Sequence, residues 1–165
     1  MRKVVLLFSL IAVMASCKSK KSAANANKPK PVEVATDARV PLDELDADQK
    51  KRSYEFGHRI LNACNTSRFK PFNSSEATPS VIKNVTESKI TKTCHQFRLK
   101  YGEFREMTLV EVVRNKKDET NVYRYKAEYS KKIANKELRV IMNDDNKLVA
   151  IKSTDWVDKY DPIKN

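Results

Sequence analysis

The chain has 165 residues, a net charge of +12 from 33 Lys and Arg against 21 Asp and Glu, and 40% hydrophobic residues. This length suits one domain with a core of its own. Only two glycines are present, which argues against phosphate-binding loops, because such loops need glycines for close backbone approach.

The chain begins with the organisation of a secretion signal that ends in a cysteine. Arg2 and Lys3 precede an apolar run over residues 4–13, and two small residues stand directly before Cys17. A run of about ten to thirteen residues matches the apolar part of a signal peptide and is shorter than the ~20 residues that span a bilayer. The alternatives are a signal without lipidation and an uncleaved anchor with a cysteine near its end.

Residues 14–17, Met-Ala-Ser-Cys, resemble the lipobox of bacterial lipoproteins. The resemblance implies that Cys17 is lipidated, that the signal is cut before it, and that the chain is anchored in a membrane of the cell envelope. Lys18 follows Cys17, and no acidic run comes after it. By analogy with lipoprotein sorting, this implies the periplasmic face of the outer membrane. An exported protein is not expected to bind nucleic acid, and its basic residues either contact anionic lipid or solvate the surface.

The next segment, up to residue 41, is rich in Lys, Ser, Ala, Asn and Pro and has no apolar periodicity. This composition cannot bury enough surface to fold, so it predicts a disordered basic tether. The predicted organisation is therefore a signal peptide at 1–16, the lipidated cysteine and its tether at 17–41, and one folded domain at 42–165.

Helical periodicity marks the first half of the predicted domain. A helix is expected to begin between residues 42 and 48, where acidic side chains complement the helix dipole, and to end near Ala63. Thr78 followed by Pro79 predicts the start of a second helix. A further helical segment is expected to end at Gly102, which has the position of a C-terminal cap.

Cys64 and Cys94 remain as a pair once Cys17 carries lipid. In an oxidising compartment this favours a disulfide between two helical regions. The alternatives are two buried thiols and a metal site that also uses His58 and His95. Helical spacing argues against the metal site, because His58 and Cys64 point about 120° apart. The sequence predicts no metal and no cofactor.

After Gly102 the apolar period changes from about 3.6 to 2, which predicts strands. Four runs alternate in this way, at about 107–113, 122–129, 138–142 and 148–151, and short polar turns join them. Helices followed by an antiparallel meander predict an α+β domain, with the N-terminal helices packed on one face of a four-stranded sheet.

This pattern resembles the cystatin-like α+β roll of the nuclear-transport-factor-2-like superfamily, in particular its small secreted bacterial members. In that superfamily a curved sheet wraps helices into a cone, whose interior is a ligand pocket in some members and packed core in others. The resemblance implies candidate pocket-lining residues with tyrosine hydroxyls in an apolar hollow; they are Phe97, Tyr101, Tyr123, Tyr125, Tyr129 and Met142. The alternative is that these residues form packed core.

No catalytic motif stands out. Carboxylates fall in turns or on the charged face of strands, and neither histidine has an identifiable acid partner, so the sequence offers no positioned acid–base pair. Trp156, the only tryptophan, is a candidate docking residue for a partner, or it folds back to seal the open end of the sheet.

These observations predict a non-catalytic, lipid-anchored periplasmic domain that binds a small apolar ligand or an envelope protein. The alternatives are a solid-core structural or accessory subunit of an envelope complex and, third, an enzyme.

Overall fold

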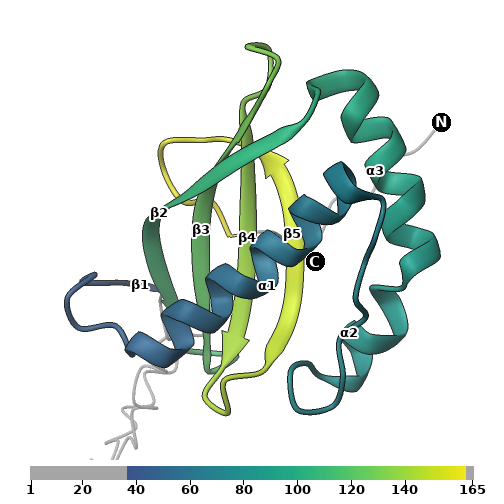
Figure 1. The fold of residues 1–165 in the computed structure, drawn as a ribbon. Coiled ribbons are helices and arrows are strands. Elements are labelled where there is room, and N and C mark those ends of the chain that lie inside the picture. The colour runs from purple at the N-terminus through teal and green to yellow at the C-terminus, as the bar shows by residue number, and fades with distance from the viewer. Residues whose placement is uncertain (1–36, 163–165) are drawn as a thin grey trace, which may run out of the picture. The chain divides into compact units, whose positions relative to one another are not determined.

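The computed structural model describes residues 37–162, which form an α+β fold. The predicted signal peptide, Cys17 and most of the predicted tether lie outside the described residues. Three helices accompany one antiparallel sheet, whose strand order follows the chain. The elements are β1 (Ala38–Val40), α1 (Ala47–Thr66), α2 (Pro79–Asn84), α3 (Glu87–Tyr101), β2 (Phe104–Asn115), β3 (Thr120–Tyr129), β4 (Lys136–Asn143) and β5 (Leu148–Asp155). In Figure 1, α1 crosses one face of the sheet, and α2 and α3 lie on the side of β5.

The helices begin and end where local chemistry requires. The Asp46 carboxylate accepts a hydrogen bond of 2.6 Å from the Gln49 backbone N–H and so caps the start of α1. Helix α2 begins at Pro79, whose missing N–H costs nothing in the first turn. Helix α3 ends at Gly102, which has a φ of 82°. This backbone conformation favours glycine, which has no Cβ to clash.

The sheet has five strands, so the prediction of four was wrong by one. The additional strand, β1, pairs antiparallel with β2 through Ala38↔Arg114, Arg39↔Val113 and Val40↔Val112. It lies inside the segment predicted as a tether, and the sheet therefore begins before residue 42. Three residues are too few for period-2 alternation to be visible in a sequence, so only the partner strand reveals this element.

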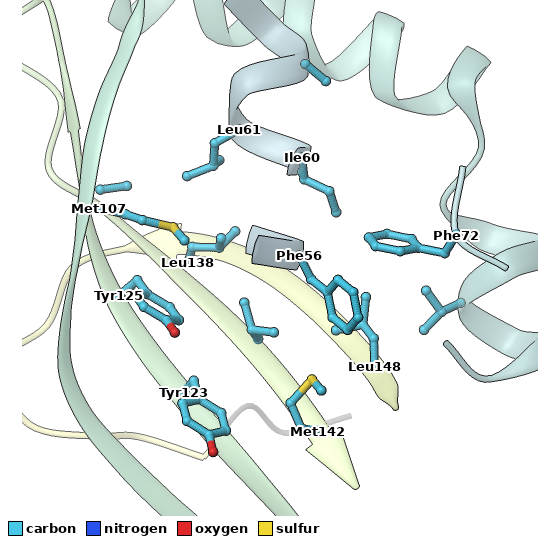
Figure 2. Close-up of a cluster of buried hydrophobic side chains, with 14 of the residues drawn as sticks. Phe56, Ile60, Leu61, Phe72, Met107, Tyr123, Tyr125, Leu138, Met142 and Leu148 are labelled. Carbon is cyan, nitrogen blue, oxygen red and sulfur yellow. The ribbon is translucent and has the colours of Figure 1, made fainter. Parts of the chain in front are cut away.

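The core lies between α1 and the sheet, as Figure 2 shows. Phe56, Ile60 and Leu61 of α1 point towards the strands, and the ring of Phe72 packs edge-on against Phe56 with centroids 5.4 Å apart. Each such side chain stabilises the fold by roughly 1.5–3 kcal/mol when fully buried. The sheet side contributes Met107, Tyr123, Tyr125, Leu138, Val140, Met142 and Leu148, all nearly inaccessible to solvent.

Gly57 lets α1 approach the sheet closely. A Cβ at this position would lie 2.9 Å from Leu138 Cδ2, 3.0 Å from Met107 Cε and 3.2 Å from Val140 Cγ2. These atoms come from β4 and β2, so both strands press on the same point of the helix. Glycine weakens a helix by about 1 kcal/mol relative to alanine, and here the close packing explains its presence.

Candidate functional site

The six candidate pocket residues fall into two separate groups. Tyr123, Tyr125 and Met142 lie in the core under α1 and are at most 1% exposed. Phe97, Tyr101 and Tyr129 gather at the C-terminal end of α3, with ring centroids 5.2–6.3 Å apart. The structure therefore does not join all six around one hollow.

The hydroxyl groups of the two core tyrosines are bound by polar residues of α1. Tyr123 donates to Gln49 Oε1 at 2.9 Å, and the Tyr125 and Ser53 hydroxyls lie 2.7 Å apart. Burial raises the pKa of both phenols, that of Tyr125 to about 12. These hydroxyls are thus partners of the helix, and the interior beneath α1 is packed core. Tyr125 also borders a shallow hollow of about 630 Å³ between α1 and β2, whose rim carries four charged residues.

The aromatic group at the end of α3 encloses a lysine. Lys136 Nζ lies 5.3 Å from the Tyr101 ring centroid and 5.6 Å from that of Phe97, and it pairs with Asp155 at 2.8 Å. Burial raises the pKa of Tyr129 to about 12, and its buried hydroxyl has no hydrogen-bond partner among residues 37–162. The packing of these rings joins the end of α3 to β3 and β4.

A groove lies between α3 and strand β5 and has a volume of about 380 Å³. Its floor includes Leu138 and Ile151 from β4 and β5, and its opposite wall includes Ile90, Thr93 and Phe97 of α3. Most of the lining surface is apolar, and Lys89 and Lys152 also line it. This volume lies within the range of small-molecule sites.

The wall of this groove is held in place by the disulfide between Cys64 of α1 and Cys94 of α3, whose Cα atoms are 4.6 Å apart. The predicted pairing is therefore present. Only Cys94 and Tyr101 of α3 are buried, whereas most of its other side chains are exposed. A helix with so little burial depends strongly on its covalent link.

The sequence pattern did not predict this groove. Ile90, Cys94 and Phe97 stand at positions i, i+4 and i+7 of α3 and so share one apolar stripe of the helix. In the structure only Cys94 of the three is buried, and Ile90 and Phe97 are partly exposed in the groove. The sequence signal for the groove is the polar residues around this stripe. A helix with three apolar positions in two turns buries only a narrow face, and its flanks stay open to solvent.

The face of the sheet opposite α1, here called the outer face, carries a buried charge cluster of Glu111, Arg124, Glu137 and Arg139. Arg124 donates to both carboxylate oxygens of Glu137, at 2.9 and 2.6 Å, and also pairs with Glu111. Arg139 lies two residues after Glu137 on β4, on the same face of the sheet, and also pairs with the Glu137 carboxylate. Arg124 and Glu137 are 0% exposed.

The Glu137 carboxylate stays ionised in this cluster. Desolvation by burial raises its pKa, but hydrogen bonds from Arg124 and Arg139 outweigh that effect and hold the pKa below its ordinary value. The hydrogen bonds of Arg124 to Glu137, the larger cause, and to Glu111 raise the pKa of Arg124. Each charge is therefore neutralised by a partner rather than by loss or gain of a proton.

Residues 156–162, here called the C-terminal segment, cover the charge cluster. Arg124 donates to the Val157 carbonyl oxygen at 2.7 Å, and Arg139 donates to that of Asp161 at 2.6 Å. The Arg124 guanidinium carbon lies 4.8 Å from the Trp156 ring centroid and 5.6 Å from that of Tyr160. Trp156, predicted either to dock a partner or to seal the open end of the sheet, thus packs on the outer face and is half-buried.

The two histidines lie apart from any carboxylate contact in the described part of the chain. His58 stacks on Tyr54 and meets Phe104 edge-on, at 5.8 and 5.7 Å between centroids, and His95 is exposed on α3. Residues 37–162 contain no group of three His, Cys, Asp or Glu side chains arranged to hold a metal ion. None of the helices described is both long and apolar enough to cross a membrane.

Comparison with models of protein families, with curated proteins and with solved structures found no match to this chain.

Proposed function

We propose that this chain is a bacterial lipoprotein, lipidated at Cys17 and held at the periplasmic face of the outer membrane. The signal-like residues 1–16 and the lipobox-like residues before Cys17 support the anchor. The compact domain that follows has its own core and a disulfide, which suits an oxidising compartment. We also propose that the helices and the curved meander form a cystatin-like roll, which the order of one long helix, two shorter helices and the meander supports.

The folded domain is, in this proposal, a non-catalytic binding domain whose site is the groove between α3 and β5. The observation that carries this proposal is the apolar lining of that groove at a place where α3 leaves Ile90 and Phe97 incompletely covered. Apolar side chains in an open groove bind apolar groups of a ligand, and nearby lysines favour an acidic one.

A second candidate function is that of an accessory subunit with a solid core. The observation that favours it is the packed interior beneath α1, where Tyr123, Tyr125 and Met142 belong to the core and are at most 1% exposed. Such a subunit contacts its complex through an outer surface and needs no internal ligand.

The anchor is tested by the substitution Cys17→Ser. Because lipid can be attached only to the thiol, the variant is expected to move from the membrane fraction to the soluble periplasmic fraction. Its urea unfolding curve should match that of the domain released from the wild-type protein, since the buried hydrophobic core of residues 37–162 is made of residues between Phe56 and Leu148. Retention of the variant in washed membranes would contradict lipidation as the anchor.

The groove is tested with the dye 1-anilinonaphthalene-8-sulfonate, which is apolar and carries one negative charge. Thr93→Trp places a large ring in the groove and is expected to weaken dye binding about tenfold, equivalent to 1.4 kcal/mol. Thr91→Trp is the matched control, because Thr91 lies on α3 but lines a different hollow. Equal dye binding by both variants would contradict the groove as the binding site.

A further inference from the structure

The edge of strand β5 runs along the groove. β5 is the last strand of the sheet and pairs with β4 on one side only. At its start, Leu148 bonds on the other side to the connector before α2: Leu148 N donates to Glu76 O at 2.9 Å, and Thr78 N donates to Leu148 O at 3.0 Å. This short bridge ends at Pro79, where α2 begins. The connector therefore does not pair with the rest of the β5 edge.

Two peptide groups of this edge point outward beside the groove. Trp156 N donates to Asn135 O at 3.0 Å, which shows that the backbone of Trp156 faces β4. In an antiparallel pair the hydrogen-bonded positions alternate, so Ser153 and Ile151 face away from β4. Among residues 37–162, no backbone hydrogen bond outside the strand ladders involves these two residues, and no side chain is bonded to their peptide groups.

The side chains of the same two residues lie on the groove side of the sheet. Ile151 pairs with Val140 and Ser153 pairs with Leu138, and both partners belong to the core face. A chain laid along β5 would therefore place every second side chain in the groove, against Ile90 and Phe97 of α3. Strand addition to a sheet edge needs two things. Main-chain hydrogen bonds give the affinity, and pockets for alternate side chains give the specificity.

Charge selects among possible chains. Lys89 of α3 lines the groove and is exposed, and the chain as a whole has a net charge of +12. A basic surface favours acidic side chains on the exposed positions of an added strand. The chain's own residues 18–36 carry five lysines and one glutamate, so their net positive charge does not suit this edge.

We propose that the groove binds an extended segment of a partner protein, with alternating apolar and acidic residues, which pairs with β5 as a sixth strand. This inference rests on the proposed function, because it names the partner of the same groove. It also gives a role to α3, which forms the wall against which the apolar side chains of the added strand pack.

The test uses a fluorescent eight-residue peptide in which valine and glutamate alternate, and the full chain carrying Cys17→Ser. Two further versions of the peptide are N-methylated on all valines or on all glutamates. Fluorescence anisotropy should show that one methylated peptide binds like the parent. The other should bind at least about tenfold more weakly, because each lost main-chain hydrogen bond costs roughly a factor of five. Equal binding of the two would overturn strand pairing.

Ser153→Pro is the corresponding change in the protein, since it removes one outward N–H from an edge strand, where proline is tolerated. It should weaken binding of the parent peptide about fivefold. Ser130→Pro, in an exposed turn away from this edge, is not a suitable control, because the Ser130 N–H is bonded to Glu103 O. The matched control is Ser153→Ala, which keeps the N–H and should bind like wild type.

The outcomes separate this inference from the function on which it rests. If the dye binds in the groove and Thr93→Trp blocks it, but none of the peptides binds, strand addition is overturned and the groove remains a site for another ligand. If the chain is instead a dimer that Ser153→Pro dissociates, the occupant of the edge is a second copy and the partner segment is overturned. If neither dye nor peptide binds, the proposed function fails as well.

Discussion

Replacing Glu137 with glutamine is expected to lower the free energy of unfolding by about 3–5 kcal/mol. Glu137 is fully buried and accepts hydrogen bonds from both Arg124 and Arg139. The amide keeps the volume of the side chain but removes its negative charge, so Arg124 keeps Glu111 as a carboxylate partner and Arg139 loses the carboxylate with which it pairs. Removing one member of a buried charge group is costly because its partners stay desolvated without compensation.

Urea unfolding followed by circular dichroism measures this effect. The control is Glu128→Gln on the neighbouring strand β3, where the side chain is exposed. It should change the free energy of unfolding by less than about 0.5 kcal/mol. Similar unfolding midpoints for the two variants would show that the charge cluster contributes little to stability.

The same substitution should alter the dependence of stability on pH. The pKa of Glu137 is lower in the folded chain than its ordinary value of 4.5. The stabilisation from its charge is therefore fully present above pH 4.5 and is lost as the pH falls through the lower, folded-state pKa. Glu137→Gln should show a shallower loss of stability below pH 4.5 than wild type. Glu76, Asp144 and Asp155 also have lowered pKa values and will contribute equally in both proteins.

Removing the disulfide with the double substitution Cys64→Ser and Cys94→Ser is expected to cost about 3–4 kcal/mol, the chain-entropy value for a loop of this length. The two cysteines are 30 residues apart. Because α3 buries only two side chains, the loss should fall first on this helix. Hydrogen exchange at residues 87–101 should accelerate more than exchange in β3, which lies inside the sheet.

Reduction of the chain that carries only Cys17→Ser, and so keeps Cys64 and Cys94, provides the control for the disulfide prediction. With the thiols intact but unpaired, exchange in α3 should approach that of the double variant, and binding of the dye in the groove should weaken as its wall loosens. Unchanged exchange at residues 87–101 after complete reduction would contradict a dependence of α3 on the covalent link. Cys17→Ser should be present throughout, so that the third thiol is absent.

Much of the fold could be predicted because its signals are local. The alternation of Tyr123 and Tyr125 with Val122 and Arg124 identifies a strand without knowledge of its partners. Thr78 before Pro79 marks the start of α2 in the same way. In contrast, β1 is defined only by its pairing with β2, and no local pattern in three residues identifies such an edge strand.

The site was harder to predict because burial on both faces of a sheet depends on distant segments. The same alternation assigns Arg124 to the outer face, and polarity suggests that this face is in water. The C-terminal segment instead covers it and supplies backbone acceptors from Val157 and Asp161. Likewise, tyrosines on the inner face fit both a pocket and a core, until Gln49 and Ser53 of α1 are seen to bind their hydroxyls.

The position of the C-terminal segment has a consequence for the order in which the domain can be completed. During synthesis Arg124, Glu137 and Arg139 emerge before the segment that covers them. Until residues 156–161 follow, the guanidinium groups remain hydrated and the outer layer of the sheet stays unfinished. The native state is therefore reached only after this segment of the domain has left the ribosome.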